Sequence, residues 1–106
     1  MRVVLATWGS FGDLHPFVAV GVGLRARGHD VVLATCPLYR AKVEAEGLAF
    51  APLRPDMPPP EEARALTTRL MDARRGPRNV LAGTVVPALR DTEADLDAAC
   101  GGADLL

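Results

Sequence analysis

The 106-residue sequence predicts an α/β fold in which helices flank a parallel sheet, and two apolar runs with a helix between them carry this prediction. Residues 3–6 (Val-Val-Leu-Ala) and 31–35 (Val-Val-Leu-Ala-Thr) are rich in β-branched residues, which is typical of strands buried on both faces of a parallel sheet. Between them, Pro16 is expected to open a helix and Gly28 to follow its end. Residues 2–35 are therefore predicted to form a β-α-β unit of a Rossmann-like sheet, with a right-handed crossover.

Apolar residues at helical spacing define the inward faces of the first two predicted helices. In the first helix they are Phe17, Val18, Val20, Gly21 and Leu24. A second helix is expected from Pro37 to near Gly47, and a short third strand over residues 48–51. The residues expected to face inward from the second helix are Tyr39, Ala41 and Val43.

Proline and glycine divide the next part of the chain. Five prolines fall within residues 52–60, so this segment is expected to be an extended surface loop. Helices are predicted over residues 61–75 and 79–99, with Gly76-Pro77 as a break between them. Pro87 predicts a kink near residues 84–87, so the second of these helices is expected to bend there.

The last residues suggest an unfinished sheet. Gly101-Gly102 is expected to end the last helix, and residues 103–106 (Ala-Asp-Leu-Leu) are typical of the entry to a fourth strand. A Rossmann-like sheet needs further strands to bury its apolar faces. We therefore expect residues 1–106 to be one part of a domain in a larger protein.

Composition excludes several classes of function. A net charge of -1 gives no electrostatic reason to expect nucleic-acid binding. The two cysteines, Cys36 and Cys100, are far apart, which argues against a disulfide framework or a zinc site and is typical of the reducing cytosol. No signal peptide and no apolar run of membrane-spanning length is present, so a cytoplasmic protein without an integral membrane segment is expected.

The loop after the first strand carries the candidate chemistry. Gly9 and Gly12 allow a tight turn before a helix N-terminus, which is either an anion site or a simple connection. Phe11 occupies the place of the second glycine in the G-x-G-x-x-G fingerprint, and the second strand ends in Thr35-Cys36-Pro37 with no acidic residue. Dinucleotide binding is therefore disfavoured.

Asp13 and His15 are the two titratable side chains of this loop. Asp13 precedes the predicted helix, where it is either an N-cap or a general base kept ionised by the helix dipole. His15 has the better ordinary pKa for base chemistry near neutrality, although it could equally cap the helix or lie on the surface. Residue pattern alone leaves these alternatives open.

The neighbouring residues of the loop have both structural and functional interpretations. Trp8 and Phe11 could line an apolar acceptor pocket or pack against the core. Ser10 could donate a hydrogen bond into the crevice or satisfy local backbone. Cys36, at the end of the second strand, is expected to be a partly buried and unreactive thiol.

A motif runs through the first 35 residues: a strand, then Gly9, Ser10, Gly12, Asp13, Pro16, Ala19 and Leu24, then Arg27-Gly28-His29, Val31 and Ala34-Thr35. With this motif the chain resembles the N-terminus of nucleotide-sugar-dependent glycosyltransferases of the GT-B fold. The branch it resembles contains bacterial natural-product glycosyltransferases, including UDP-glycosyltransferase-like enzymes of antibiotic biosynthesis, and sterol glucosyltransferases. The resemblance continues more loosely through residues 43–53 and 103–106.

The resemblance implies a two-domain enzyme in which this chain is the partial, acceptor-binding N-terminal domain. Asp13 stands at the position of the catalytic base, and Ser10 is implied to assist at the sugar or acceptor. The loop residues Trp8, Gly9, Phe11, Gly12 and His15 would surround the base. The implied reaction is inverting transfer from an NDP-sugar to a hydroxyl of a hydrophobic small molecule, with no metal or organic cofactor. The C-terminal donor-binding domain is absent from these residues, so the chain alone is expected to be inactive.

Two other functions remain as alternatives. The chain could be a non-catalytic binding or partner module, such as one half of a split transferase, or a dinucleotide-binding Rossmann domain. Whichever function applies, a domain with an unfinished sheet exposes edge strands and apolar surface. We therefore expect these residues to self-associate when they are produced alone.

Overall fold

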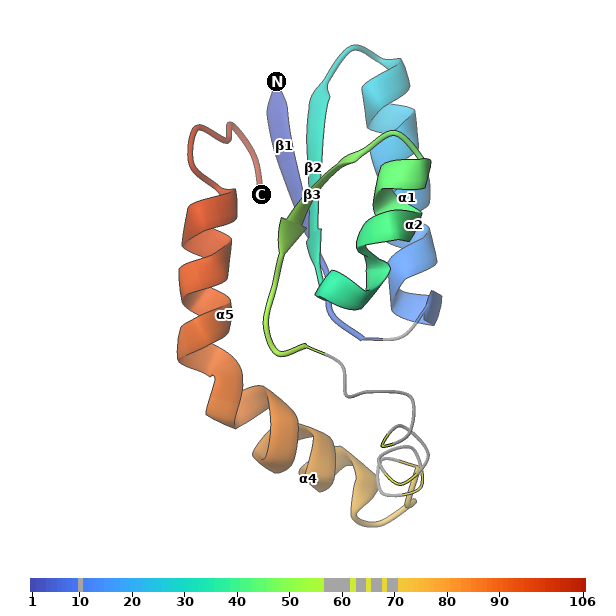
Figure 1. Cartoon of the computed structure of the whole chain (residues 1–106), viewed down its shortest axis with the longest axis vertical. Coiled ribbons are helices and arrows are strands. Elements are labelled where there is room, and N and C mark those ends of the chain that lie inside the picture. The colour runs from blue at the N-terminus through green and yellow to red at the C-terminus, as the bar shows by residue number, and fades with distance from the viewer. Residues whose placement is uncertain (10, 57–61, 63–64, 66–67, 69–70) are drawn as a thin grey trace.

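The computed structural model describes residues 1–9, 11–56, 62, 65, 68 and 71–106. Its centre is a parallel sheet of three strands in the order β1-β2-β3. The strands are β1 (Arg2–Ala6), β2 (Asp30–Thr35) and β3 (Ala49–Pro52). Figure 1 shows helices on both sides of this sheet, as the sequence predicts.

The register of the sheet aligns the carboxyl ends of its strands. Val3 lies opposite Val31 and Ala6 opposite Ala34, while Thr35 lies opposite Pro52. On the other side of β1, Leu105 forms a parallel bridge with Val3, and its carbonyl oxygen accepts the Val4 N–H at 2.9 Å. The predicted entry to a fourth strand is thus confirmed as one parallel bridge beside β1.

One face of the sheet is covered by α1 (Phe11–Ala26), η1 (Pro37–Tyr39) and α2 (Arg40–Ala45). The core on this side consists of Leu14, Val18, Val31, Leu33, Cys36, Tyr39, Val43 and Leu48. The opposite face is covered by α5 (Val86–Ala99), where Val4, Val32, Ala34 and Ala99 form a second buried cluster. Alternate residues of β2 enter the two clusters, which is the expected geometry of a strand buried on both faces.

The first helix begins earlier than predicted. Helix α1 starts at Phe11, so Pro16 lies inside it, and the prediction that Pro16 opens the helix is wrong. Gly9, two residues before the start of α1, lies at a bend and has a φ of 135°, a conformation that favours glycine. A proline this close to the N-terminus removes one intrahelical hydrogen bond, which the helix tolerates.

Only some of the residues that the sequence predicts to face inward from the helices are buried. Tyr39 and Val43 are buried, and Phe17 and Leu24 pack against the core. Val20, by contrast, is 54% exposed, and Ala41 is exposed. Gly28 has φ 90° and donates its N–H to the Arg25 carbonyl oxygen, which confirms it as the residue that follows the end of α1.

The C-terminal helical stretch contains a π-helical segment at the predicted kink. Helix α4 (Gly76–Val80) leads into the π-helix η2 (Leu81–Val85), which leads into α5. Pro87 has no N–H for the carbonyl four residues earlier, and the irregular turn lies where that hydrogen bond is lost. Gly102, with φ 75°, follows the end of α5.

The Gly76-Pro77 pair begins a helix instead of breaking one. Pro77 lies in the first turn of α4, where its missing N–H is unneeded. Ahead of it, the Asp72 carboxylate accepts the N–H groups of Arg74 and Arg75 at 2.9 and 2.7 Å. Residues 71–75 form turns, so the predicted helix over 61–75 does not reach Arg75, and most of its remainder lies outside the described residues.

Within the described part of the chain, no helix combines the length and the apolar character that a membrane crossing requires.

Candidate active site

Three segments meet where the parallel strands end. The loop after β1, the helix η1 after β2 and residues 53–56 after β3 all lie at the same end of the sheet (lower end in Figure 1). In open α/β sheets this carboxyl end is where ligands bind. The sequence-predicted loop of residues 8–15 begins here, and we take this end as the candidate site.

Gly9 brings the turn of the loop against Asp13. Its φ of 135° is a conformation that side chains rarely adopt, and a Cβ at this position would overlap the Asp13 carboxylate. The Gly9 carbonyl oxygen accepts a hydrogen bond of 2.8 Å from the Tyr39 hydroxyl. The glycine is therefore needed both for the turn and for the close approach of the Asp13 side chain.

Trp8 and Cys36 are both held by Pro55. The indole Nε1–H of Trp8 donates to the Pro55 carbonyl oxygen at 2.8 Å, and the Cys36 Sγ donates to the same oxygen at 3.4 Å. One backbone carbonyl of the segment after β3 thus joins the ends of β1 and β2. Trp8 and Cys36 both belong to the core cluster beneath α1.

Phe11 forms an exposed aromatic surface next to this turn. Its ring centroid lies 5.0 Å from that of Tyr39 and 5.6 Å from that of His15, and its side chain is 52% exposed. His15 is also exposed, on the second turn of α1. The structure thus places Phe11 and His15 together, with about half of the Phe11 side chain exposed.

Asp13 is the third residue of α1 and is exposed. It therefore does not occupy the N-cap position that the sequence left open for it, because the helix starts two residues before it. Asp13 thus lies in the first turn, at the positive end of the helix dipole. Gly12 is exposed in the same turn, and Ser10, the remaining predicted site residue, lies outside the described residues.

Burial shapes the acid–base behaviour of the two groups beneath the loop. Burial raises the pKa of the Cys36 thiol, and the charge of Asp56 raises it further, although the Gly9 N–H that donates to the sulfur opposes the change. Burial therefore disfavours the thiolate, which is the reactive form of a cysteine. Burial also raises the pKa of Tyr39, with smaller contributions from Cys36 and from the negative charge of Asp13. Tyr39 thus remains a hydrogen-bond donor, and it lies within electrostatic range of Asp13.

The sequence predicted Asp13 as a candidate site residue, but it did not predict the residues that fix the loop that carries Asp13. Tyr39 was expected only as a core residue, and the proline-rich segment only as a surface loop. A tyrosine among aliphatic inward positions is the one signal that pointed to a polar role, since a buried phenol usually has a hydrogen-bond partner. No signal in the sequence marked the carbonyl of Pro55.

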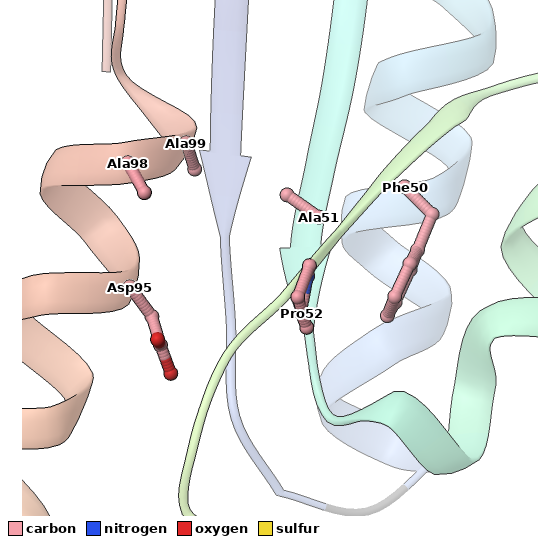
Figure 2. A pocket seen from close by; sticks show the side chains of 6 residues that line it. All are labelled: Phe50, Ala51, Pro52, Asp95, Ala98 and Ala99. Carbon is pink, nitrogen blue, oxygen red and sulfur yellow. The ribbon is translucent and has the colours of Figure 1, made fainter.

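The described residues form no cluster of metal-binding side chains. Among them, no group of three or more His, Cys, Asp or Glu side chains could hold a metal ion. A hollow of ≈ 200 Å³ lies between β3 and α5 (Figure 2) and contains no residue of the Asp13 loop. Its lining residues are Phe50, Ala51, Pro52, Asp95, Ala98 and Ala99.

Together, the fold and the loop define a parallel α/β domain that presents an exposed carboxylate at the carboxyl end of its sheet. Comparison with known families identifies it: residues 3–101 match the glycosyltransferase family 28 N-terminal domain, and the chain belongs to this family. The predicted resemblance to GT-B natural-product and sterol glycosyltransferases is confirmed.

Curated relatives include transferases of antibiotics and sterols. An O-mycaminosyltylonolide 6-deoxyallosyltransferase of Streptomyces fradiae is 56% identical over 50 residues, which are 47% of this chain and 12% of that protein. A UDP-sugar-dependent glycosyltransferase of Dictyostelium discoideum is 43% identical over 65% of this chain and 4% of its own length. A sterol 3-beta-glucosyltransferase of Cryptococcus neoformans is 44% identical over 47% of this chain and 3% of its own length. The chain therefore spans a small part of these relatives.

Solved structures show the same fold. The glycosyltransferase SsfS6 of Streptomyces sp. SF2575 matches 72% of this chain and 20% of its own, with 30% identity and a TM-score of 0.51. The same enzyme has been solved in complex with thymidine diphosphate. The glycosyltransferase of kitacinnamycin matches 89% of this chain and 22% of its own, with 26% identity and a TM-score of 0.50. The three parallel strands and their helices are thus those of the N-terminal domain of GT-B glycosyltransferases.

Proposed function

We propose that the chain supplies the acceptor-binding part of an inverting glycosyltransferase, which moves a sugar from an NDP-sugar to a hydroxyl of a hydrophobic small molecule. The observation that carries this proposal is the exposed Asp13 carboxylate in the first turn of α1, at the carboxyl end of the sheet. A chain of this glycosyltransferase family needs a proton acceptor beside its acceptor hydroxyl, and Asp13 has the chemistry and the access for that role.

In the proposed reaction, Asp13 accepts the proton of the acceptor hydroxyl as that oxygen attacks the anomeric carbon. A new bond forms between the oxygen and the anomeric carbon, while the bond from that carbon to the nucleoside diphosphate breaks. The electron pair of the broken bond leaves with the diphosphate. Attack opposite the leaving group inverts the anomeric configuration. No metal or organic cofactor takes part in this proposal.

Asp13 is preferred to His15 as the base because of how each is held. The turn at Gly9, fixed by the Tyr39 hydroxyl, packs directly against Asp13. The described contact of His15 is with the ring of Phe11, at 5.6 Å between centroids. A fixed position matters because a base must meet the proton within hydrogen-bonding distance. We therefore assign His15 to the acceptor surface.

The acceptor is proposed to be an apolar, hydroxylated natural product, sterol or lipid. The exposed ring of Phe11 beside the site favours an apolar partner. The relatives that act on a tylonolide derivative and on sterols point to the same class. Trp8 lies below this surface and is proposed to support the loop that forms it.

The donor is proposed to bind mainly to a separate C-terminal domain. The solved neighbours are about five times longer than the part that matches this chain, since the match covers 20% and 22% of them. A complex with thymidine diphosphate among these neighbours supports a nucleotide sugar as the donor. Residues 1–106 alone are therefore proposed not to transfer sugar.

The test is product analysis with the transferase that carries this chain. The enzyme is incubated with a panel of NDP-sugars and with macrolide and sterol acceptors, and the glycoside is identified by mass spectrometry. NMR coupling constants then give the anomeric configuration. We expect inversion relative to the donor and no product from residues 1–106 alone. Retention of configuration would contradict the mechanism, and product formed by the isolated chain would contradict the assignment of the donor site to another domain.

A further inference from the structure

The segment after β3 joins helix α5 to the loop that carries Asp13. We call residues 53–56 the bridging segment. Its first residue, Leu53, is buried and donates its N–H to the Thr35 carbonyl oxygen at 2.9 Å, so the segment starts from the end of β2. The next two residues, Arg54 and Pro55, then bind different parts of the molecule.

Arg54 is bound to α5 through both its backbone and its side chain. Its guanidinium binds Asp95 in a two-pronged arrangement, with Nε 2.9 Å from Oδ2 and Nη2 3.0 Å from Oδ1. The backbone N–H of Arg54 donates to the same carboxylate at 2.8 Å, and the Arg54 carbonyl oxygen accepts from the Thr92 hydroxyl at 2.6 Å. Nη1 adds an ion pair with Asp91 at 3.4 Å. This set of bonds fixes the position and the orientation of Arg54 on the helix.

Pro55, the next residue, is hydrogen-bonded to two residues of the candidate active site. Its carbonyl oxygen accepts the indole N–H of Trp8 at 2.8 Å and the thiol of Cys36 at 3.4 Å. Trp8 directly precedes Gly9, and Gly9 packs against the Asp13 carboxylate. A shift of Arg54 on α5 must therefore move the carbonyl that holds Trp8, one residue from the turn that places Asp13.

We infer that Arg54 is a positioning residue, which fixes the Asp13 loop by locking the bridging segment to α5 so that the Pro55 carbonyl holds Trp8. The kinetic part of this inference rests on the proposed role of Asp13 as the base. The structural part, that Arg54 sets the environment of the Trp8 indole, does not depend on that role.

The chemistry favours arginine specifically. A lysine would keep the positive charge near Asp91 and Asp95 but has no planar fork to bind Asp95 through two nitrogens. We call the Arg54–Asp95 pair the clamp. Arg54→Lys keeps the positive charge of the clamp but removes its two-pronged geometry. Arg90, an exposed arginine on the same helix, provides the matched control as Arg90→Lys.

The structural test uses the single tryptophan of these residues as a probe. In the ¹⁵N-labelled transferase that carries this chain, the indole Nε1–H signal of Trp8, identified as the one that Trp8→Phe removes, reports the hydrogen bond to Pro55. We expect Arg54→Lys and Asp95→Asn each to shift this signal and to speed its hydrogen exchange, while Arg90→Lys leaves both unchanged. An indole signal that is identical in wild type, Arg54→Lys and Asp95→Asn, with circular dichroism showing all three folded, would overturn the inference.

The kinetic test uses the transferase that carries this chain. Misplacing a base by a fraction of an ångström lowers turnover more than binding, so we expect Arg54→Lys to lower kcat by about tenfold with little change in KM for the donor. Asp95→Asn should lower kcat similarly, and the double variant should cost no more than either single one. If Asp13→Asn abolishes turnover while both clamp variants retain full kcat, the inference fails and the proposed function stands. If the clamp variants shift the indole signal but Asp13→Asn is fully active, the proposed function fails and the structural link remains.

Discussion

Two aromatic side chains hold the turn that places Asp13, each through one hydrogen bond. Tyr39 donates to the Gly9 carbonyl oxygen, and Trp8 donates to that of Pro55, both at 2.8 Å. Both donors are partly shielded from water, so losing either partner would leave a polar group poorly satisfied. Two successive residues, Trp8 and Gly9, are therefore fixed from two different elements, and this gives the loop a defined conformation.

Tyr39→Phe should loosen the turn without disturbing the packing. The ring would still lie against Phe11, but the hydroxyl that binds Gly9 would be gone. We expect the free energy of unfolding to fall by about 1 kcal/mol, the usual contribution of one such hydrogen bond. Urea denaturation measures this, with Leu38→Ala, an exposed neighbour in η1, as the control. Equal stability of Tyr39→Phe and wild type would show that the hydroxyl does not support the turn.

The site could be predicted from the sequence only as far as its local motif extends. Gly9, Asp13 and Phe11 lie within five residues of one another, so their spacing alone placed them in one loop. The groups that fix that loop come from far along the chain: Tyr39 lies 30 residues after Gly9, and Pro55 lies 47 residues after Trp8. The register of the three strands decides which of these distant groups meet. In addition, any residue can supply a backbone carbonyl as a hydrogen-bond acceptor, so the residue type at position 55 does not reveal this contact.

At the scale of elements, strands were easier to predict than helix ends. The buried strands β1 and β2 are continuous apolar runs, and burial on both faces leaves little freedom in their bounds. Gly76-Pro77 gave a wrong helix boundary because a proline in the first turn starts a helix and does not break one. Pro16 gave a wrong boundary because α1 extends one turn further toward the N-terminus and accepts the loss of one hydrogen bond at this proline. The signal that lies nearest the start of α1 is Gly9, whose φ of 135° favours glycine.

The contrasting environments of Gly9 and Gly23 allow a matched pair of substitutions. Gly9→Ala would force a side chain into a φ of 135° and into contact with Asp13, so we expect a loss of stability of about 1–2 kcal/mol and reduced turnover. Gly23 lies inside α1, and a Cβ there would meet open space. Gly23→Ala should therefore stabilise the domain by about 0.5–1 kcal/mol. Thermal unfolding measures both, and a Gly9→Ala variant as stable as wild type, or more stable, would refute the role given to Gly9.

At the scale of the whole molecule, the described chain is more extended than its length requires. Its radius of gyration is 14.8 Å and its dimensions are 44 × 25 × 22 Å, whereas a compact domain of this length has a radius of about 13 Å. Helix α4 and the start of α5 reach beyond the end of the sheet (Figure 1). Much apolar surface is exposed along the helices: Phe11, Val20, Leu38, Leu81, Val86 and Leu89.

This surface, with the edge strand β3, predicts self-association of residues 1–106 when they are produced alone. Size-exclusion chromatography with light scattering should give a mass above the 11.2 kDa of one chain, increasing with protein concentration. A monomer at every concentration tested would show that the exposed apolar residues do not associate.

The central claim, that Asp13 is the catalytic base, is tested most directly by the turnover of Asp13→Asn in the transferase that carries this chain. Asparagine keeps the size of the side chain but accepts no proton, so we expect kcat to fall by about 10²- to 10⁴-fold with an unchanged unfolding temperature. His15→Asn, measured alongside, should retain most of the turnover. Full kcat in Asp13→Asn, or loss of turnover in His15→Asn alone, would contradict the account.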